Sequence, residues 1–154
     1  MDVQEIMVEK VFRINVHATV KDAVDLMNKH EIGCLVVERN SEVEGIITER
    51  DILKRVVSEL KNPEQITVED AMSKPLIVGG PMMYIEDAAR LMFKKNIKKL
   101  PIMDNEKIVG IVTLSDIARA TNIEPQITKV VEELMENGWF PTKKMKQVVD
   151  FYIV

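Results

Sequence analysis

The sequence predicts an α/β fold, more narrowly of the α+β kind, in which two β-α-β-β-α repeats pack with pseudo-two-fold symmetry and a C-terminal helical extension follows. The first observation is that residues 3–57 realign on 68–122 without a gap, at a constant spacing of 65 residues. The second is that both copies show the same order of β-branched runs and helical apolar stripes. The third is a tail with no counterpart in either copy. We therefore expect three parts, namely residues 1–61, 62–122 and 123–154.

Identical residues hold the two copies in frame over their whole length. The clearest pairs are Val3/Val68, Met7/Met72, Asp22-Ala23/Asp87-Ala88, Leu26-Met27/Leu91-Met92, Gly45-Ile46/Gly110-Ile111, Thr48/Thr113 and Asp51-Ile52/Asp116-Ile117. A unit of this length buries its apolar face poorly on its own, so the copies should pack against each other. Any site that one copy offers should then recur in the other, near the shared seam.

The composition excludes several classes of protein. A chain of 154 residues, 46% apolar and 30% charged, is long enough to bury a sizeable core, roughly 68–70% of its unfolded surface. The net charge of −4 argues against a protein that lives by binding nucleic-acid phosphates. No apolar run reaches the length of about 18 residues that a membrane span needs, and no signal-peptide pattern opens the chain. The single cysteine, Cys34, cannot form an internal disulfide, so we expect a cytoplasmic protein.

The first copy predicts a strand, a helix, a hairpin and a second helix. Residues 11–14 form the short strand, and Thr19 is the expected N-cap of the helix that follows. Residues 34–38 and 43–48 are rich in β-branched residues and predict two strands joined by a turn. The second helix is expected over about 49–60, before a proline breaks the chain.

The second copy repeats this order. Its expected elements are a short helix ending at Met72, a first strand at 76–78, a turn at 79–81, a helix from Ile85, a hairpin of 100–103 with 108–113, and a helix at 114–120. The turn reads Gly79-Gly80-Pro81, and its glycines could instead let the backbone approach a ligand closely.

The tail predicts two amphipathic helices joined by an apolar corner at 139–141. The first helix carries the stripe Ile127, Val130, Val131, Leu134 and ends near Asn137-Gly138, and the second carries Met145, Val148, Val149, Tyr152. These features suit either a cap packed over the repeats or a contact with another protein, for which Trp139 and Phe140 would be anchors.

The strongest local signal is a strand that ends in Thr-x-x-Asp, found once in each copy. It reads Thr48-Glu49-Arg50-Asp51 in the first copy and Thr113-Leu114-Ser115-Asp116 in the second. A threonine three residues before an acid at the start of a helix predicts a capping box, in which the hydroxyl and the carboxylate accept hydrogen bonds from backbone N–H groups. The acid also suits the helix N-terminus electrostatically. Local physics alone therefore demands no ligand here.

With these elements the sequence resembles the tandem CBS domain, or Bateman module, over residues 3–122. The signs are the β-α-β-β-α unit, the Gly-Ile-[Ile/Val]-Thr-x-x-Asp-Ile element, the helix starts 19–23 and 84–88, and the strands 32–37 and 97–102. Two copies in one frame make the match specific. The resemblance implies two three-stranded sheets with outer helices, two clefts between the copies, and a homodimer formed through the outer helices.

The resemblance also implies adenosine-containing ligands in those clefts: AMP, ADP or ATP first, with S-adenosylmethionine or NAD-type molecules as alternatives. Asp51 and Asp116 would each accept hydrogen bonds from vicinal ribose hydroxyls, a task that suits a carboxylate because it has two acceptor oxygens. Thr48 and Thr113 would be small donors on the ribose or phosphate side. The adenine contacts would fall on the first strand and on the strand after the first helix of each copy, represented here by Ile14, Cys34, Val78 and Lys99.

Phosphate groups need cations nearby, and the two copies differ in what they offer. Arg50 precedes Asp51 in the first copy, whereas Ser115 takes that place in the second. The second copy instead has the dense basic run Lys94-Lys95 and Lys98-Lys99. These lysines suit a solvated helix C-terminus, and the alternative is that Lys98 or Lys99 faces a phosphate. The sequence does not rank the two clefts.

We expect no metal site, no resident cofactor and no catalytic residue. His17 and His30 are isolated, and His30 with Cys34 supplies at most two of the ligands that a metal site needs. No nucleophile or acid–base set stands out. The leading hypothesis is a stand-alone module that senses adenine nucleotides and signals to an unknown protein partner by a shift in conformation. The alternative is a structural or interaction module without a small ligand; nucleic-acid binding through residues 94–99 and an enzyme fit less well.

Overall fold

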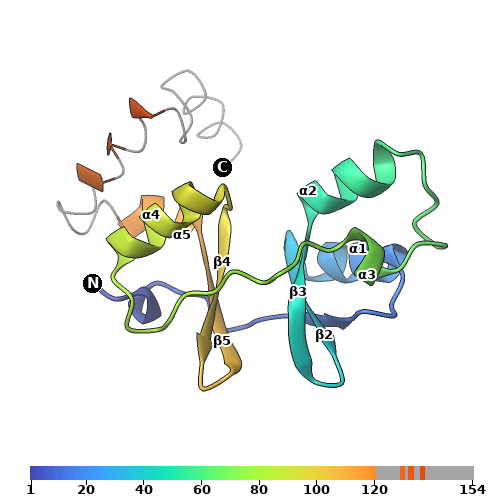
Figure 1. Cartoon of the computed structure of the whole chain (residues 1–154), viewed down its shortest axis with the longest axis horizontal. Coiled ribbons are helices and arrows are strands. Elements are labelled where there is room, and N and C mark those ends of the chain that lie inside the picture. The colour runs from blue at the N-terminus through green and yellow to red at the C-terminus, as the bar shows by residue number, and fades with distance from the viewer. Residues whose placement is uncertain (121–128, 131, 134–135, 138–154) are drawn as a thin grey trace. The chain divides into compact units, whose positions relative to one another are not determined.

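Apart from the first strand of the second copy, the helices and strands follow the order that the repeat predicts (Figure 1). The structure, a computed structural model, describes residues 1–120, 129–130, 132–133 and 136–137. Its elements are η1 (Val3–Glu5), β1 (Arg13–Asn15), α1 (Val20–His30), β2 (Cys34–Arg39), β3 (Glu42–Thr48), α2 (Glu49–Ile52), η2 (Leu53–Val57), α3 (Val68–Ala71), α4 (Ile85–Lys95), β4 (Lys99–Asp104), β5 (Lys107–Thr113) and α5 (Leu114–Ala120). The predicted α/β fold with tandem repeats is confirmed.

Two compact units make up the chain, and each combines parts of both sequence repeats. Unit 1 holds Met1–Glu9 and Gly79–Val154, and unit 2 holds Lys10–Val78. Residues 1–9, which open the first repeat, therefore pack with the helices and strands of the second, as the dark-blue η1 in Figure 1 shows. The equivalent residues 66–74 pack with those of the first repeat. We call residues 1–9 and 66–74 the opening segments.

Backbone hydrogen bonds hold the opening segment of unit 2 at the start of two helices. Val68 is the first residue of α3, and its N–H donates to Ala18 O at 2.8 Å. Val20 is the first residue of α1, and its N–H donates to Ile66 O at 2.9 Å. The first N–H groups of a helix have no partner inside the helix. Ile66 of the opening segment therefore supplies a carbonyl to α1, and Ala18, just before α1, supplies one to α3.

Unit 1 repeats this exchange at the repeat spacing. Val3 N–H, at the start of η1, donates to Met83 O at 2.8 Å, and Ile85 N–H, at the start of α4, donates to Met1 O at 3.2 Å. Both donors and both acceptors align with those of unit 2 in the sequence. The exchange of opening segments is therefore a property of the repeat and not of one copy.

The opening segments also extend the sheets. In unit 2, β1 pairs parallel with β2 and β2 pairs antiparallel with β3. Ser73 adds two backbone hydrogen bonds to Ile46 of β3, with N···O distances of 3.1 and 2.8 Å. In unit 1, β4 and β5 form an antiparallel pair, and Val8 takes the same place against Ile111 of β5.

A glycine stands where each opening segment meets its sheet. A Cβ atom at Gly45 would overlap the carbonyl oxygen of Ser73, and a Cβ at Gly110 would lie 2.5 Å from Met7 Sδ. A glycine within a strand often marks the close approach of another backbone. The glycine of the Gly-Ile-[Ile/Val]-Thr element therefore has a packing cause in both copies.

Each unit buries one apolar face of its long helix. The predicted N-cap of α1 is confirmed, because Thr19 Oγ1 accepts a hydrogen bond from Asp22 N–H at 3.1 Å. α1 buries Val20, Ala23 and Met27, and α4 buries the aligned residues Ile85, Ala88 and Met92 together with Ala89. The core of unit 2 adds the following side chains: Val16, Leu35, Val37, Ile47, Val56, Val68, Ala71 and Met72.

The expected strand at 76–78 is wrong, and so is the expected three-stranded sheet of the second copy, because β4 and β5 form a two-stranded sheet. The residues aligned with β1 end in Gly79-Gly80, and the pairing is reduced to one parallel bridge between Gly79 and Ile102. Glycine weakens a strand, and Pro81 has no N–H with which to continue the ladder. The turn expected at 79–81 starts at Gly80 in the structure and not at Gly79. Gly79 belongs to the bridge, and Gly80 O accepts a hydrogen bond from Met83 N–H at 3.1 Å.

The expected helix over 49–60 changes type along its length. Regular α-helix ends at Ile52, and the chain continues as the π-helix η2, where Ser58 N–H donates to Leu53 O at 2.9 Å. Leu60 then ends the turn with a φ of 55°. A π-helix is rare, and no spacing in the sequence indicates this one.

The C-terminal extension is described only in part. Residues 129–130, 132–133 and 136 are helical, as the first predicted stripe requires, and Val130 is buried. The remaining predicted features of the extension lie outside the described residues, namely Ile127, Val131, Leu134, the corner at 139–141 and the second stripe over 145–152.

An ion-pair network fastens α3 to the hairpin of unit 2. Arg39 Nε lies 2.7 Å from Glu44 Oε1, and Arg39 Nη2 lies 2.5 Å from Glu69 Oε1. The hydrogen bond from Arg39 is the main reason that the pKa of Glu44 lies below its ordinary value of 4.5. Unit 1 has no such network, because the aligned residues are Asp104, Val109 and Gln4.

Alanine substitutions at Gly45 and Gly110 should lower the stability of the chain by different amounts. Gly45→Ala meets a backbone carbonyl that cannot move cheaply, so we expect it to lower the free energy of unfolding by about 1–3 kcal/mol. Gly110→Ala meets the flexible side chain of Met7 and should cost less. Gly80→Ala is the control, because its Cβ would enter open space. Chemical denaturation measures all three, and equal stability of the Gly45 and Gly80 variants would contradict this account.

The Arg39 network should make stability depend on pH in the acid range. The folded pKa of Glu44 is lowered, so its contribution is present above the unfolded pKa and is lost as the pH falls through the folded pKa. In Arg39→Gln, the pKa of Glu44 should return toward its ordinary value and this loss should shrink. NMR titration of the Glu44 carboxyl measures the pKa directly, and an unchanged value in the variant would rule out Arg39 as the cause.

Candidate functional site

The Thr-x-x-Asp element of unit 2 joins the end of β3 to the start of α2. Thr48 is the N-cap, and its Oγ1 accepts a hydrogen bond from Asp51 N–H at 3.2 Å. Asp51 Oδ2 in turn accepts from Thr48 N–H at 2.9 Å and from Thr48 Oγ1–H at 3.1 Å. The predicted capping box is therefore confirmed, and it occupies one oxygen of the carboxylate.

Unit 1 builds the same box between β5 and α5. Asp116 N–H donates to Thr113 Oγ1 at 3.3 Å. Asp116 Oδ2 accepts from Thr113 N–H at 2.7 Å and from Thr113 Oγ1–H at 2.8 Å. In both copies Oδ2 faces the backbone and Oδ1 is left for other partners.

Both carboxylates are buried. Asp51 is 7% exposed and Asp116 is 8% exposed, and among the described residues they are the charged side chains that are buried. Burying a charge is costly unless the charge is paired and hydrogen-bonded. The partners of Oδ1 therefore decide what each aspartate can do.

Asp51 Oδ1 is bound by the opening segment and by an arginine. Ser73 Oγ–H donates to it at 2.7 Å, and Arg55 Nη1 lies 3.5 Å away. The same Arg55 nitrogen donates to Ala71 O at 2.9 Å and to Met72 O at 2.6 Å. One guanidinium thus ties the carboxylate to the end of α3.

Asp116 Oδ1 has a simpler environment. Arg119 Nη2 lies 2.7 Å from it, and the side chain of Arg119 is 76% exposed. Neither partner of Asp51 Oδ1 recurs, because Val8 aligns with Ser73 and Ala120 aligns with Arg55. The two sites are alike in their caps and different beyond them.

The other predicted ligand residues lie on the elements around each cap. Cys34 is the strand partner of Thr48, and Lys99 is the strand partner of Thr113. Arg50 and Ser115 are exposed in the helical turn after each threonine. The structure therefore gathers Cys34, Thr48, Arg50 and Asp51 in unit 2 and gathers Lys99, Thr113, Ser115 and Asp116 in unit 1. Their roles toward a ligand stay predictions.

The predicted adenine-side residues are partly buried. Ile14 lies in β1, where it pairs with Val37 of β2. Val78 is the last residue of unit 2, directly before the bridge at Gly79. Both side chains keep some exposure, as a contact with a ligand base requires.

Sequence reasoning missed three partners of the aspartates. Arg55 follows Asp51 by four residues and Arg119 follows Asp116 by three, spacings at which helical side chains meet. That spacing could have identified both arginines. Ser73 could not have been found in this way, because a bond between residues so far apart in sequence depends on where the opening segment packs.

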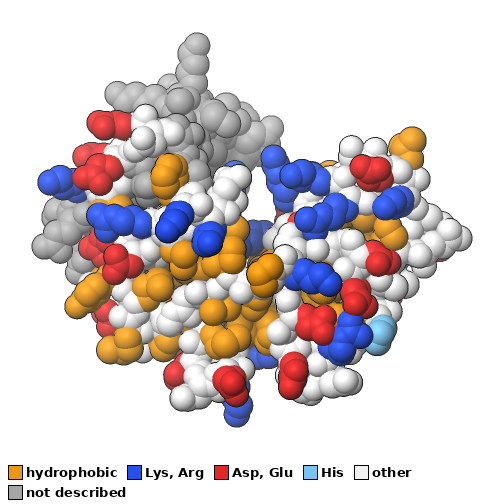
Figure 2. Space-filling model, viewed as in Figure 1, with side chains coloured by type: hydrophobic (Ala, Val, Ile, Leu, Met, Phe, Trp, Pro, Cys, Tyr) orange, Lys and Arg blue, Asp and Glu red, His pale blue; other side chains and the backbone are white. Residues whose placement is uncertain are grey.

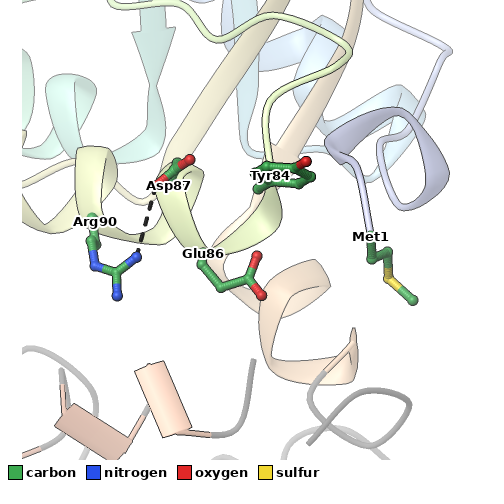
Figure 3. Close-up of a pocket in the computed structure, with 5 residues that line it drawn as sticks. All are labelled: Met1, Tyr84, Glu86, Asp87 and Arg90. Carbon is green, nitrogen blue, oxygen red and sulfur yellow. Dashed lines mark ion pairs between the residues drawn. The ribbon is translucent and has the colours of Figure 1, made fainter. Parts of the chain in front are cut away.

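A surface hollow of about 380 Å³ lies elsewhere in unit 1 (Figure 3). It is lined by Met1, Tyr84, Glu86, Asp87 and Arg90, with an ion pair between Arg90 and Asp87. None of the predicted ligand residues lines it. Its charged side chains are Glu86, Asp87 and Arg90.

The described residues show neither a metal-ligand cluster nor a helix able to span a membrane. Figure 2 shows that basic and acidic side chains both occur over each unit on the face in view. No three His, Cys, Asp or Glu side chains come together as metal ligands within the described residues. No helix in that part of the chain has the length and apolar content to cross a membrane.

Comparison with known proteins finds the CBS domain twice, over residues 3–58 and 68–122. An uncharacterized protein of Methanopyrus kandleri is 43% identical, over 71% of this chain and 56% of its own length. The CBS domain-containing protein YhcV of Bacillus subtilis is 35% identical, over 75% of this chain and 82% of its own. An inosine-5′-monophosphate dehydrogenase of Nitrosopumilus maritimus is 34% identical over 76% of this chain but 24% of its own length. The chain thus spans little more than half of the first protein and a quarter of the dehydrogenase.

Solved structures agree with this match. The hexameric CBS-CP12 protein from bloom-forming cyanobacteria is 36% identical with a TM-score of 0.73, over 77% of this chain and 69% of its own. An uncharacterized conserved protein from Pyrococcus horikoshii is 31% identical with a TM-score of 0.73, over 78% and 91%. Both similarities support the fold of the tandem repeats.

Removing the Ser73 hydroxyl should destabilise the chain. Hydrogen bonds to charged groups contribute about 1.5–3 kcal/mol, so Ser73→Ala should lower the free energy of unfolding by roughly that amount. Ser58→Ala is the matched control, because Ser58 is exposed and surface substitutions usually stay within about 0.5 kcal/mol. Urea denaturation of both variants measures the difference, and equal stability would show that the Ser73–Asp51 bond contributes nothing.

Proposed function

Because the chain belongs to the CBS-domain family, with two copies that cover most of its length, we propose that it is a regulatory module that binds an adenosine-containing ligand. AMP, ADP and ATP are the leading candidates. The chain acts by changing its conformation on binding and not by catalysis. The proposal rests on the family match and on the chemistry of the two Thr-x-x-Asp elements.

The observation that carries the proposal is a buried carboxylate fixed by a threonine cap at the end of a strand in each unit. The cap holds Oδ2 and fixes the orientation of Oδ1. A carboxylate oxygen that is held in place accepts hydrogen bonds from neighbouring hydroxyls without a further loss of side-chain entropy. The vicinal hydroxyls of a ribose are donors of this kind, and bonds to a charged acceptor are strong.

Nearby cations would receive the phosphate groups. Arg50 is exposed beside Asp51, and Lys99 lies opposite Thr113 on the paired strand. The candidate positions of the two units thus differ in their cation, as the sequence predicts. A nucleotide fits such a set better than a nucleoside does, because each phosphate adds charge for the cation to bind.

Regulation follows from differential binding. A ligand that binds one conformation of the module more tightly shifts the population toward it, by no more than the difference in affinity. A protein partner or a fused domain would read that shift. The dehydrogenase of Nitrosopumilus maritimus supports this role, because the matched region is a minor part of an enzyme.

A second candidate function is a protein-interaction module. Leu53, Val57 and Leu60 are large apolar residues that are 58%, 57% and 94% exposed, and they follow one another at helical spacing after α2. Such a stripe favours a contact with another protein, and a homodimer is the assembly that we propose for it. The stripe does not conflict with ligand binding, because none of its residues belongs to the caps.

A ligand panel tests the proposed function. At a concentration of 100 Kd, a ligand adds about 2.7 kcal/mol to the free energy of unfolding. We expect thermal stabilisation by AMP, ADP or ATP, with S-adenosylmethionine and NADH as the alternative ligands. The matched control is 2′,3′-dideoxy-ATP, which lacks the diol and should stabilise much less than ATP.

Two outcomes would count against the proposal. No stabilisation by any ligand of the panel would favour the interaction module. Equal stabilisation by ATP and by its dideoxy analogue would show that a ligand binds without use of the ribose diol.

A further inference from the structure

We propose that the two aspartates have different tasks: Asp116 receives the ribose diol, and Asp51 is a staple that holds the opening segment of unit 2. This inference narrows the two candidate sites of the proposed function to one: the chain binds one nucleotide, through Asp116, and Asp51 takes no part in binding. The part of this inference that concerns Asp116 rests on the proposed function. The part that concerns Asp51 rests on contacts within unit 2 alone.

Three hydrogen bonds and one ion pair hold Asp51 in the staple. A carboxylate offers about four acceptor positions. In Asp51 two are used by Thr48, one by Ser73 Oγ–H at 2.7 Å and one faces Arg55 Nη1 at 3.5 Å. A ribose diol brings two donors, so at Asp51 it would have to displace Ser73 or move Arg55 away from the carboxylate.

Arg55 cannot be displaced without loss elsewhere. Its Nη1 also donates to the carbonyls of Ala71 and Met72, which end α3. The last carbonyls of a helix have no partner inside the helix, so Arg55 satisfies them. Ser73 is likewise tied by its two backbone bonds to Ile46. Release of Asp51 would therefore loosen the end of α3 and its attachment to β3 together.

Asp116 keeps one acceptor position open. Thr113 uses two positions at Oδ2, and Arg119 uses one at Oδ1. Within the described residues no further group bonds to this carboxylate. The side chain of Arg119 is 76% exposed. Within the described part of the chain, Asp116 is its one hydrogen-bond partner. The guanidinium can thus turn into solvent with the loss of this one hydrogen bond, and the two diol hydroxyls replace it at Oδ1.

The sequence difference between the copies agrees with this division. The position of Ser73 is held by Val8 in unit 1, which has no hydroxyl, and the position of Arg55 is held by Ala120. Lys99, the strand partner of Thr113, supplies a cation on the strand next to the cap. Unit 1 therefore combines a fixed carboxylate, an open acceptor position and a lysine, whereas unit 2 uses its carboxylate to hold its own fold.

Isothermal titration of AMP and of ATP into the full chain tests the division. The wild type should bind about one molecule per chain. Asp116→Asn should weaken binding at least about tenfold, because one charged acceptor of two hydroxyls is lost. Asp51→Asn should keep the affinity within about twofold and lower the Tm by several degrees, whereas Asp116→Asn should change the Tm less.

Ser73→Ala is the second variant, in case Asp51→Asn does not fold. It removes the staple and leaves both carboxylates, so the Tm should fall and the affinity should stay within about twofold. Two molecules bound per wild-type chain would overturn the inference. So would a tenfold loss of affinity in Asp51→Asn or Ser73→Ala with Asp116→Asn unchanged.

Failure of the proposed function gives a different result. If neither AMP nor ATP binds the wild type, the role of Asp116 is overturned together with the proposed function. The role of Asp51 is then judged by its Tm alone. A lower Tm for Asp51→Asn than for Asp116→Asn would still assign the staple, and equal Tm values would overturn it.

Discussion

A buried carboxylate must have its acceptor oxygens satisfied, and this constraint shapes both halves of the molecule. Asp51 and Asp116 are fixed first by their own capping threonines, which join a strand to the following helix. The two sites differ in the groups that bind Oδ1 of each aspartate. In unit 2 the partner comes from the opening segment of the other repeat, so one side chain links the cap, the sheet edge and the end of α3. In unit 1 the partner is an exposed arginine from the same helix.

The exchange of opening segments is what makes this link available. Residues 1–9 and 66–74 satisfy the first N–H groups of α4 and α1, and each meets its sheet at a glycine. An opening segment that meets its sheet there can place a side chain against the capping aspartate at the end of the strand. Ser73 does so and Val8 does not. The two copies share one frame, and they differ at Val8/Ser73 in the exchanged segments and at Arg55/Ala120 after the caps, so the two caps are chemically different.

Local patterns in the sequence predict much of this structure. Thr19, Thr48 and Thr113 are caps because a threonine three residues before an acid is a local signal. The prediction of a strand at 76–78 was wrong. A strand needs hydrogen bonds to a neighbouring strand, and around Gly79-Gly80-Pro81 the pairing is reduced to one bridge. The π-helix η2 has no pattern of its own. The Ser73–Asp51 bond is also invisible in sequence, because it follows from the packing of the exchanged segment and not from spacing.

The two carboxylates differ in their freedom to accept a new partner. The most direct measurement is the carboxyl ¹³C resonance of each aspartate, followed by NMR while AMP is added to the full chain. We expect the Asp116 resonance to move with ligand, together with the resonances of the side-chain nitrogens of Arg119, while the Asp51 resonance stays in place. Movement of the Asp51 resonance by the same amount, or of Asp51 alone, would contradict this expectation.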